Sequence, residues 1–185
     1  SGDDVTGANP LLLTALSGTT GFYRQPIAAS TFTTASLADG NWHHYAVTMK
    51  SASAGVTTKF YVDGQLNNTT TLGTAGINDV STPGLRAHVG ALVAPISGTW
   101  TTPSPTAAGD GKLSGSLDEF RYWKTQRTSK DIGRYWFTQV GGGVNTDPKP
   151  YITTQELANV NLGVYFKFNE GITGIASTDS IVLDY

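Results

Sequence analysis

The chain has 185 residues, of which 38% are hydrophobic and 14% are charged, and its formal net charge at pH 7 is −2. Its 12 Lys and Arg residues are scattered, so no basic cluster could neutralise several phosphates, and nucleic acid is not an expected partner. The absence of cysteine excludes disulfides, thiolate metal sites and cysteine nucleophiles, and no apolar run approaches the ~18 residues that insertion into a membrane requires.

Segments of alternating apolar and polar residues, separated by Gly, Pro and Asn clusters, predict an all-β domain. The predicted strands are, in chain order, Leu11–Leu16, Gly21–Arg24, Thr31–Leu37, Trp42–Met49, Thr58–Val62, Gln65–Thr70, Arg86–Leu92 and Leu113–Trp123. In TTKFYVDGQLNNTTT, Asp63 and Gly64 separate two strand-like runs, and both can take the positive φ of a two-residue type I′ turn. The sequence therefore predicts a β-hairpin at this position.

Two segments differ from this strand pattern. PISGTWTTPSPTAAGDG, residues 95–111, is a long polar loop with one large aromatic residue, and loops of this length are often functional or mobile. QRTSKDIGRYWF predicts the single helix of the chain, with Thr128 or Ser129 as its N-cap. Ile132, Tyr135 and Trp136 share one face of that helix, which is therefore expected to pack on the sheets.

The stretch LADGNWHHYAVTMK contains two adjacent histidines, which could indicate a metal site or a catalytic base. If Trp42–Met49 is a strand, His43 and His44 point to opposite faces and cannot share one metal ion, and no acidic residue follows at metal-ligand spacing. We therefore predict a structural pair, in which one histidine is buried with a hydrogen-bond partner and the other is partly exposed. Trp42, like Trp123 and Trp136, is assigned to core or helix packing.

NWHHYAVT, KFYVDG, HVGAL and GSLDEFRYWKTQRTSKDI, in this order, resemble the laminin-G-like modules of the concanavalin A-like lectin and glucanase superfamily. The resemblance covers Trp42 to Tyr135, about half of the chain. It implies a two-sheet antiparallel jelly-roll sandwich with one short helix, in which the tryptophan and one histidine of WHH are structural.

The C-terminal segments GVYFKFNEG and DSIVLDY resemble the opening strands of the same kind of module. The predicted organisation is a sandwich over residues 1–140, a linker or long turn over 141–160, and strands over 161–185. Those last strands either open a second module or complete the first in permuted order. GRYWFTQVGGG and YFKFNEG resemble repeats in large structural proteins of marine bacteriophages, which implies a virion-surface or extracellular location.

A glycoside hydrolase would require two paired carboxylates, which this superfamily supplies as E-x-D-x-x-E on one strand face. In SGSLDEFRYW, Asp118 and Glu119 are adjacent and so point to opposite faces. Phe120, Tyr122 and Lys124, at two, four and six positions after Asp118, are not acidic. The protein is therefore not expected to be an enzyme, although a pair assembled across separate loops is left open.

Calcium is the cofactor best suited to this composition, because it takes oxygen ligands from loops, and laminin-G-like relatives often hold it at the rim of the sandwich. The candidate metal ligands are Asp63, Asp79, Asp110 and Asp118, which are expected in or near turns. The alternative is turn chemistry at Asp63 and an ion pair of Asp118 with Arg121 or Arg86.

Carbohydrate binding is the function that the resemblance most readily implies, and it requires an exposed aromatic ring with polar neighbours. Trp100 is the leading ligand-binding candidate, with the alternative that it folds back over the sandwich edge. Its possible neighbours are Tyr23, Asn67, Asn68, Asn78 and Asp79. We predict a non-catalytic module that binds a glycan or cell-surface polymer; the alternative is a structural spacer whose partners are neighbouring virion subunits.

Overall fold

The computed structural model of the chain describes residues 10–17, 20–77, 88–89, 113, 115–140 and 161–168. The chain divides into two compact units, Ser1–Ser114 and Gly115–Tyr185. A strand that follows the predicted linker pairs with a strand that precedes it. The predicted organisation into a sandwich over 1–140 and strands over 161–185 stays a prediction. The predicted linker itself, 141–160, lies outside the described residues.

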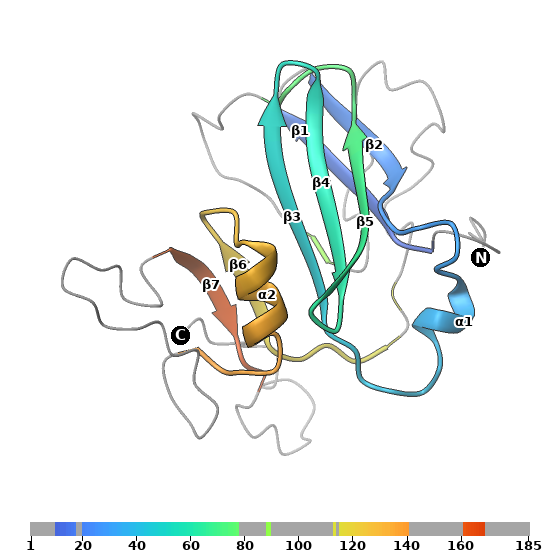
Figure 1. Cartoon of the computed structure of the whole chain (residues 1–185), viewed down its shortest axis with the longest axis vertical. Helices are drawn as coiled ribbons and strands as arrows, with labels where there is room; N and C mark the ends of the chain where they lie inside the picture. Colours follow the sequence, from blue (N-terminus) through green and yellow to red (C-terminus); the bar gives the residue numbers. More distant parts are fainter. Residues whose placement is uncertain are drawn as a thin grey trace, which may run out of the picture. The chain divides into compact units, whose positions relative to one another are not determined.

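The first unit contains two antiparallel sheets (Figure 1). Strands β1 (Leu12–Ser17) and β2 (Thr20–Pro26) form one pair. Strands β3 (Tyr45–Ala52), β4 (Gly55–Val62) and β5 (Gln65–Leu72) form a three-stranded meander, and the short helix α1 (Thr34–Leu37) lies in the connection between β2 and β3.

The predicted hairpin is confirmed as the β4–β5 connection, with Val62 paired to Gln65. Asp63 and Gly64 have φ values of 48° and 76°, which is the pair of positive φ angles that a type I′ turn requires. Gly takes this conformation at little cost and Asp tolerates it better than most residues, so the Asp-Gly dipeptide explains the turn.

The core of the first unit draws side chains from both of its sheets. Its buried members are Phe22, Ile27, Ala28, Phe32, Val56, Phe60 and Leu72. Phe60 is at its centre: Phe32 meets it edge to face with ring centroids 5.6 Å apart, and Tyr45 stacks on it at 6.0 Å. Because one apolar cluster joins the β1–β2 pair to the β3–β4–β5 sheet, the predicted antiparallel sandwich is confirmed.

The second unit pairs β6 (Phe120–Trp123) antiparallel with β7 (Leu162–Phe166) and contains α2 (Ser129–Tyr135). The predicted helix is confirmed with its cap: the Thr128 hydroxyl accepts a hydrogen bond from the Asp131 amide at 3.1 Å. The Asp131 carboxylate in turn accepts from the Thr128 backbone amide at 3.4 Å, so the two residues form a capping box. No helix in the described ranges is long and apolar enough to cross a membrane.

Three predicted strands differ from the structure. The segment Thr31–Leu37 was expected to be a strand, but it contains helix α1, because the Ser36 hydroxyl reaches back to the Thr33 backbone amide and hydroxyl. The described residues therefore contain two short helices, where the sequence predicted one. The strand expected from Trp42 begins only at Tyr45, and the one expected over Leu113–Trp123 is confined to Phe120–Trp123. The predicted strand Arg86–Leu92 lies outside the described residues, apart from positions 88 and 89.

Candidate functional site

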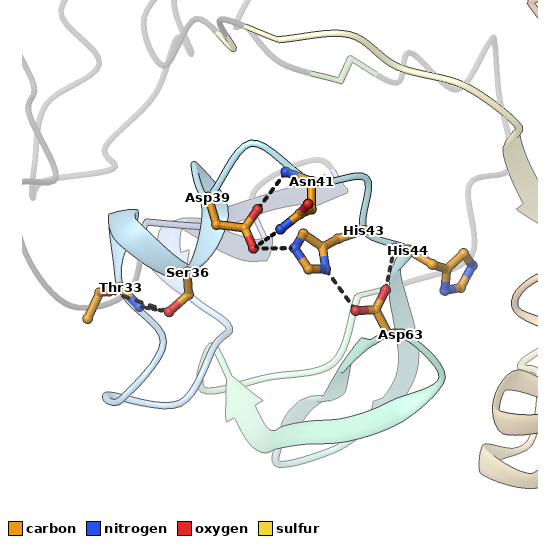
Figure 2. A network of polar contacts seen from close by, with 7 residues as sticks. All are labelled: Thr33, Ser36, Asp39, Asn41, His43, His44 and Asp63. Atoms are coloured by element: carbon orange, nitrogen blue, oxygen red, sulfur yellow. Dashed lines mark hydrogen bonds and ion pairs between the residues drawn. The ribbon is translucent and has the colours of Figure 1, made fainter.

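The most extensive polar network in Figure 2 surrounds His43, where the loop after α1 meets the β4–β5 turn. We call Asp39, Asn41, His43, His44 and Asp63 the His43 cluster. The ring of His43 lies between two carboxylates: Nδ1 is 2.7 Å from Asp63 Oδ2, and Nε2 is 3.1 Å from Asp39 Oδ2. Both ring nitrogens are therefore engaged within the chain.

Asp63 occupies this position because of the register of the sheet. Tyr45, the first residue of β3, pairs with Val62, the last residue of β4, so His44 and Asp63 follow as the next opposite positions. The Asp63 amide donates to the His44 carbonyl at 2.9 Å, and Asp63 Oδ1 accepts from the His44 amide at 2.8 Å. One aspartate thus forms the turn, binds the backbone of His44 and binds the ring of His43.

Asp39 is held from the other side by a local turn. Its Oδ1 accepts the Asn41 backbone amide at 2.8 Å, and its Oδ2 accepts the Asn41 side-chain amide at 3.0 Å. Aspartate commonly binds the backbone two residues ahead in this way. The loop between α1 and β3 is therefore fixed at both ends of the WHH sequence.

These contacts change the acid–base behaviour of the cluster. Hydrogen bonds from the side chain and backbone of Asn41, then from His43, lower the pKa of Asp39 to about 2. Burial alone would raise the pKa of Asp63, but hydrogen bonds from His43 and His44 outweigh it and the pKa is lowered. Hydrogen bonds to Asp63 and Asp39 raise the pKa of His43 above 6.5, which favours its protonated form.

The geometry fits a structural bridge better than a catalytic or metal site. A protonated His43 donates from both nitrogens, so neither nitrogen is left to accept a proton from a substrate. The imidazole separates the two carboxylates, which therefore cannot act together on one bond. His43 and His44 point away from each other (Figure 2), as expected, and the described part of the chain holds no group of three or more His, Asp or Glu able to bind a metal.

Trp42 differs from its predicted role. It was assigned to the core, yet 71% of its surface is exposed. Strand alternation does not apply to Trp42, because β3 begins three residues later, at Tyr45, and Trp42 lies in the preceding loop. The WHH sequence thus combines an exposed tryptophan with a structural histidine.

Three predicted ligand-binding residues have roles inside the fold. Tyr23 is only 4% exposed, so its ring is not available for stacking against a ligand. The side chain of Asn67 accepts the Ala29 amide at 2.8 Å, and that of Asn68 donates to the Ile27 carbonyl at 3.0 Å. These two amides attach β5 to the segment after β2, which explains why asparagines occur within a strand.

The remaining predicted site residues are mostly outside the described residues, namely Trp100, Asn78, Asp79 and Asp110. Asp118 is described and exposed, and its Oδ1 accepts the Glu119 amide at 2.9 Å. Of the two alternative partners considered for Asp118, Arg121 instead pairs with Glu119, with Nη2 and Oε2 2.7 Å apart, and Arg86 lies outside the described residues.

The role of Asp39 and the link between Asp63 and His43 were missed at the level of sequence. The search for ligands considered acidic residues that follow the histidines at short spacing, whereas Asp39 precedes His43 and Asp63 lies 20 positions away. The available signal was the Asp63-Gly64 turn, which fixes the register and so places Asp63 opposite His44.

Comparisons with known proteins identify the family of this fold. A family model described as the concanavalin A-like lectin/glucanases superfamily, of laminin G type, matches residues 4–133, which is more than half of the chain. No curated protein and no solved structure matches the chain. The match spans the sandwich, the His43 cluster and most of α2, and the chain therefore belongs to the laminin-G-like family of the concanavalin A-like lectin/glucanase superfamily.

Proposed function

We propose that this protein is a non-catalytic binding module for a glycan or another cell-surface polymer, displayed on a virion or outside a cell. The family joins sugar-binding proteins with enzymes that cleave sugar polymers, so membership alone leaves both activities open. The choice between them depends on what the carboxylates of this chain do.

The observation that supports binding over hydrolysis is the engagement of every carboxylate in the described residues. Asp39 and Asp63 bind His43, Glu119 binds Arg121, Asp131 caps α2, and Asp118 binds the Glu119 amide. A glycosidase needs two carboxyl groups facing the scissile bond, about 5–5.5 Å apart for retention or 6.5–9.5 Å for inversion. The five carboxylates instead stabilise turns, a helix and a sheet.

A structural spacer that contacts neighbouring virion subunits is the second candidate, and one feature of the second unit favours it. Phe120 and Tyr122 on β6 share a sheet face with Val164 and Phe166 on β7, and Phe168 contacts Phe166. Tyr122 and Phe168 are exposed and the other three are partly exposed. An apolar face of this kind suits contacts with another protein.

The test is a glycan array probed with the whole chain, once in calcium and once in EDTA, together with a reducing-end assay on the glycans that bind. Binding without release of new reducing ends is expected. Loss of binding in EDTA would add calcium as a cofactor, and cleavage of a bound glycan would overturn the non-catalytic proposal. A folded protein that binds no glycan in either buffer would favour the spacer.

A further inference from the structure

Trp42 is the largest exposed apolar side chain in the described residues, and its neighbours in the sequence, Asn41 and His43, are polar. Tryptophan is usually mostly buried, because exposing an indole leaves a large apolar area in contact with water. Tryptophans that remain exposed on folded proteins are enriched among the residues that contribute most to binding. The 71% exposure of Trp42 therefore makes its indole a candidate for contact with a ligand.

The backbone that presents Trp42 is held on both sides. Before it, the Asn41 amide and side chain bind Asp39; after it, the His43 ring joins Asp39 to Asp63 and the His44 amide binds Asp63. An aromatic ring on a fixed loop loses little conformational entropy when a ligand binds. The exposed indole is thus presented by a loop that is already ordered.

The three residues that precede Trp42 in its loop are exposed and hydrophilic or small. Asp39, Gly40 and Asn41 are all exposed, and a Cβ added at Gly40 would meet no atom within 4 Å. A carboxylate can accept about four hydrogen bonds, and Asp39 accepts three within the chain, which leaves capacity at Oδ1 for a ligand hydroxyl. One aromatic ring among hydrogen-bonding groups matches a sugar, which has an apolar C–H face and a hydroxyl rim.

The charge of the cluster selects among sugars. Two carboxylates with lowered pKa values are ionised at neutral pH, and His43, whose pKa is raised by its hydrogen bonds to Asp63 and Asp39, offsets at most one of them. The cluster is therefore net negative, which disfavours sulfated, sialylated and uronic-acid glycans through like-charge repulsion. Neutral hydroxyl groups are good donors to the same carboxylate oxygens.

We propose that Trp42 is the stacking platform of a binding site for a neutral pyranose sugar, with Asp39 and Asn41 contributing hydrogen bonds to its hydroxyl groups. This inference rests on the proposed function and gives it a location and a ligand class. The site differs from the Trp100 loop considered from sequence, and it uses no metal ion.

The test uses the whole chain and a panel of neutral hexose oligosaccharides, with sialylated and sulfated oligosaccharides at the same ionic strength. Affinity is measured by calorimetry, and tryptophan emission is recorded during the titration. A neutral oligosaccharide should shift the emission to shorter wavelength as it covers Trp42. Trp42→Ala should weaken binding at least tenfold, and Trp42→Phe should restore part of the affinity because a flat ring remains.

Phe137→Ala is the matched control, because it removes an exposed aromatic ring, 58% exposed, at another place. It should leave affinity unchanged. Wild-type binding that persists in Trp42→Ala would overturn this site but leave the proposed function intact. No binding of any sugar by the folded wild type would overturn both, and tighter binding of the anionic panel would overturn the ligand class. If Trp42→Ala fails to fold, Trp42→Phe provides the test. Loss of the emission shift in that variant would support the site, and an unchanged emission shift would overturn it.

Discussion

His43 Nδ1 lies 2.7 Å from Asp63 Oδ2, and this contact joins the start of β3 to the β4–β5 turn across 20 positions of the sequence. The same aspartate binds the His44 amide, so the residues before β3 are held by side-chain and backbone contacts at once. The WHH sequence is therefore held against the VDG turn by hydrogen bonds to Asp63. These hydrogen bonds fix the position of the loop that contains Trp42.

Replacing Asp63 should weaken this junction in graded steps. Asp63→Asn keeps an acceptor for the His44 amide and tolerates the positive φ, but it removes the charge beside His43. Asp63→Ala removes both interactions and should lower the free energy of unfolding by about 1–3 kcal/mol. Urea denaturation should rank stability as wild type, then Asp63→Asn, then Asp63→Ala. NMR titration should show a lower pKa for His43 in both variants, because the Asp63 hydrogen bond is the largest cause of its elevation.

Asp118→Asn is the control for loss of a surface carboxylate, because Asp118 is exposed and accepts the backbone amide of the residue that follows it. It should leave the pKa of His43 unchanged. An unchanged His43 titration in Asp63→Asn would contradict the bridge.

The His43 cluster should make the free energy of unfolding depend on pH at both the acid and the alkaline end of the range. The pKa of His43 is raised above its ordinary 6.5, so its contribution is complete below pH 6.5 and is lost as the pH rises through the higher folded value. The pKa values of Asp39 and Asp63 are lowered from 3.8, so their contribution is present above pH 3.8 and is lost as the pH falls through the lowered values. Urea midpoints should therefore be highest between these limits. In His43→Gln, the decline on the alkaline side should be reduced, and an identical alkaline decline in that variant would assign it to another group.

The β4–β5 turn should be sensitive to substitution at its glycine. Gly64 has φ of 76°, and an L-residue with a Cβ pays about 1–2 kcal/mol for the left-handed conformation. Gly64→Ala should therefore lower the free energy of unfolding by about that amount and loosen the Asp63 contacts. Gly115→Ala is the control, because Gly115 does not have positive φ and an added Cβ there would meet no atom within 4 Å. Equal effects in the two variants would show that the turn conformation is not what the glycine provides.

Local chemistry explains how much of this structure the sequence could predict. The Asp63-Gly64 turn and the Thr128 cap of α2 each depend on neighbouring residues, and both were predictable. Helix α1 was missed because its apolar spacing resembles a strand while its hydroxyl groups favour a helical turn. The exposure of Trp42 could not be predicted, because it depends on where β3 begins, which pairing with β4 decides. The contacts of Asp39 and Asp63 with His43 were missed because they require the folded arrangement of two segments.

The second unit offers a test of how a partly buried charge is balanced. The Arg121 guanidinium donates to Glu119 and to the Thr138 carbonyl, and the Tyr165 hydroxyl donates to the same Glu119 carboxylate. Glu119→Ala should lower the free energy of unfolding by about 1–3 kcal/mol, because the Tyr165 hydroxyl loses its acceptor and the Arg121 guanidinium loses its carboxylate while keeping the Thr138 carbonyl. Tyr165→Phe should cost less, because it removes one donor and leaves the ion pair in place.

The double variant Glu119→Ala with Arg121→Met distinguishes the contribution of the ion pair to the free energy of unfolding from that of side-chain packing. Removing the cation as well should recover part of the loss, because a guanidinium without its carboxylate is what makes the single variant costly. The double-mutant cycle measured by urea denaturation gives this coupling directly. If the losses of the two single variants Glu119→Ala and Arg121→Met add with no coupling, Glu119 contributes mainly as the acceptor of the Tyr165 hydroxyl, and the Arg121 contact is incidental to stability.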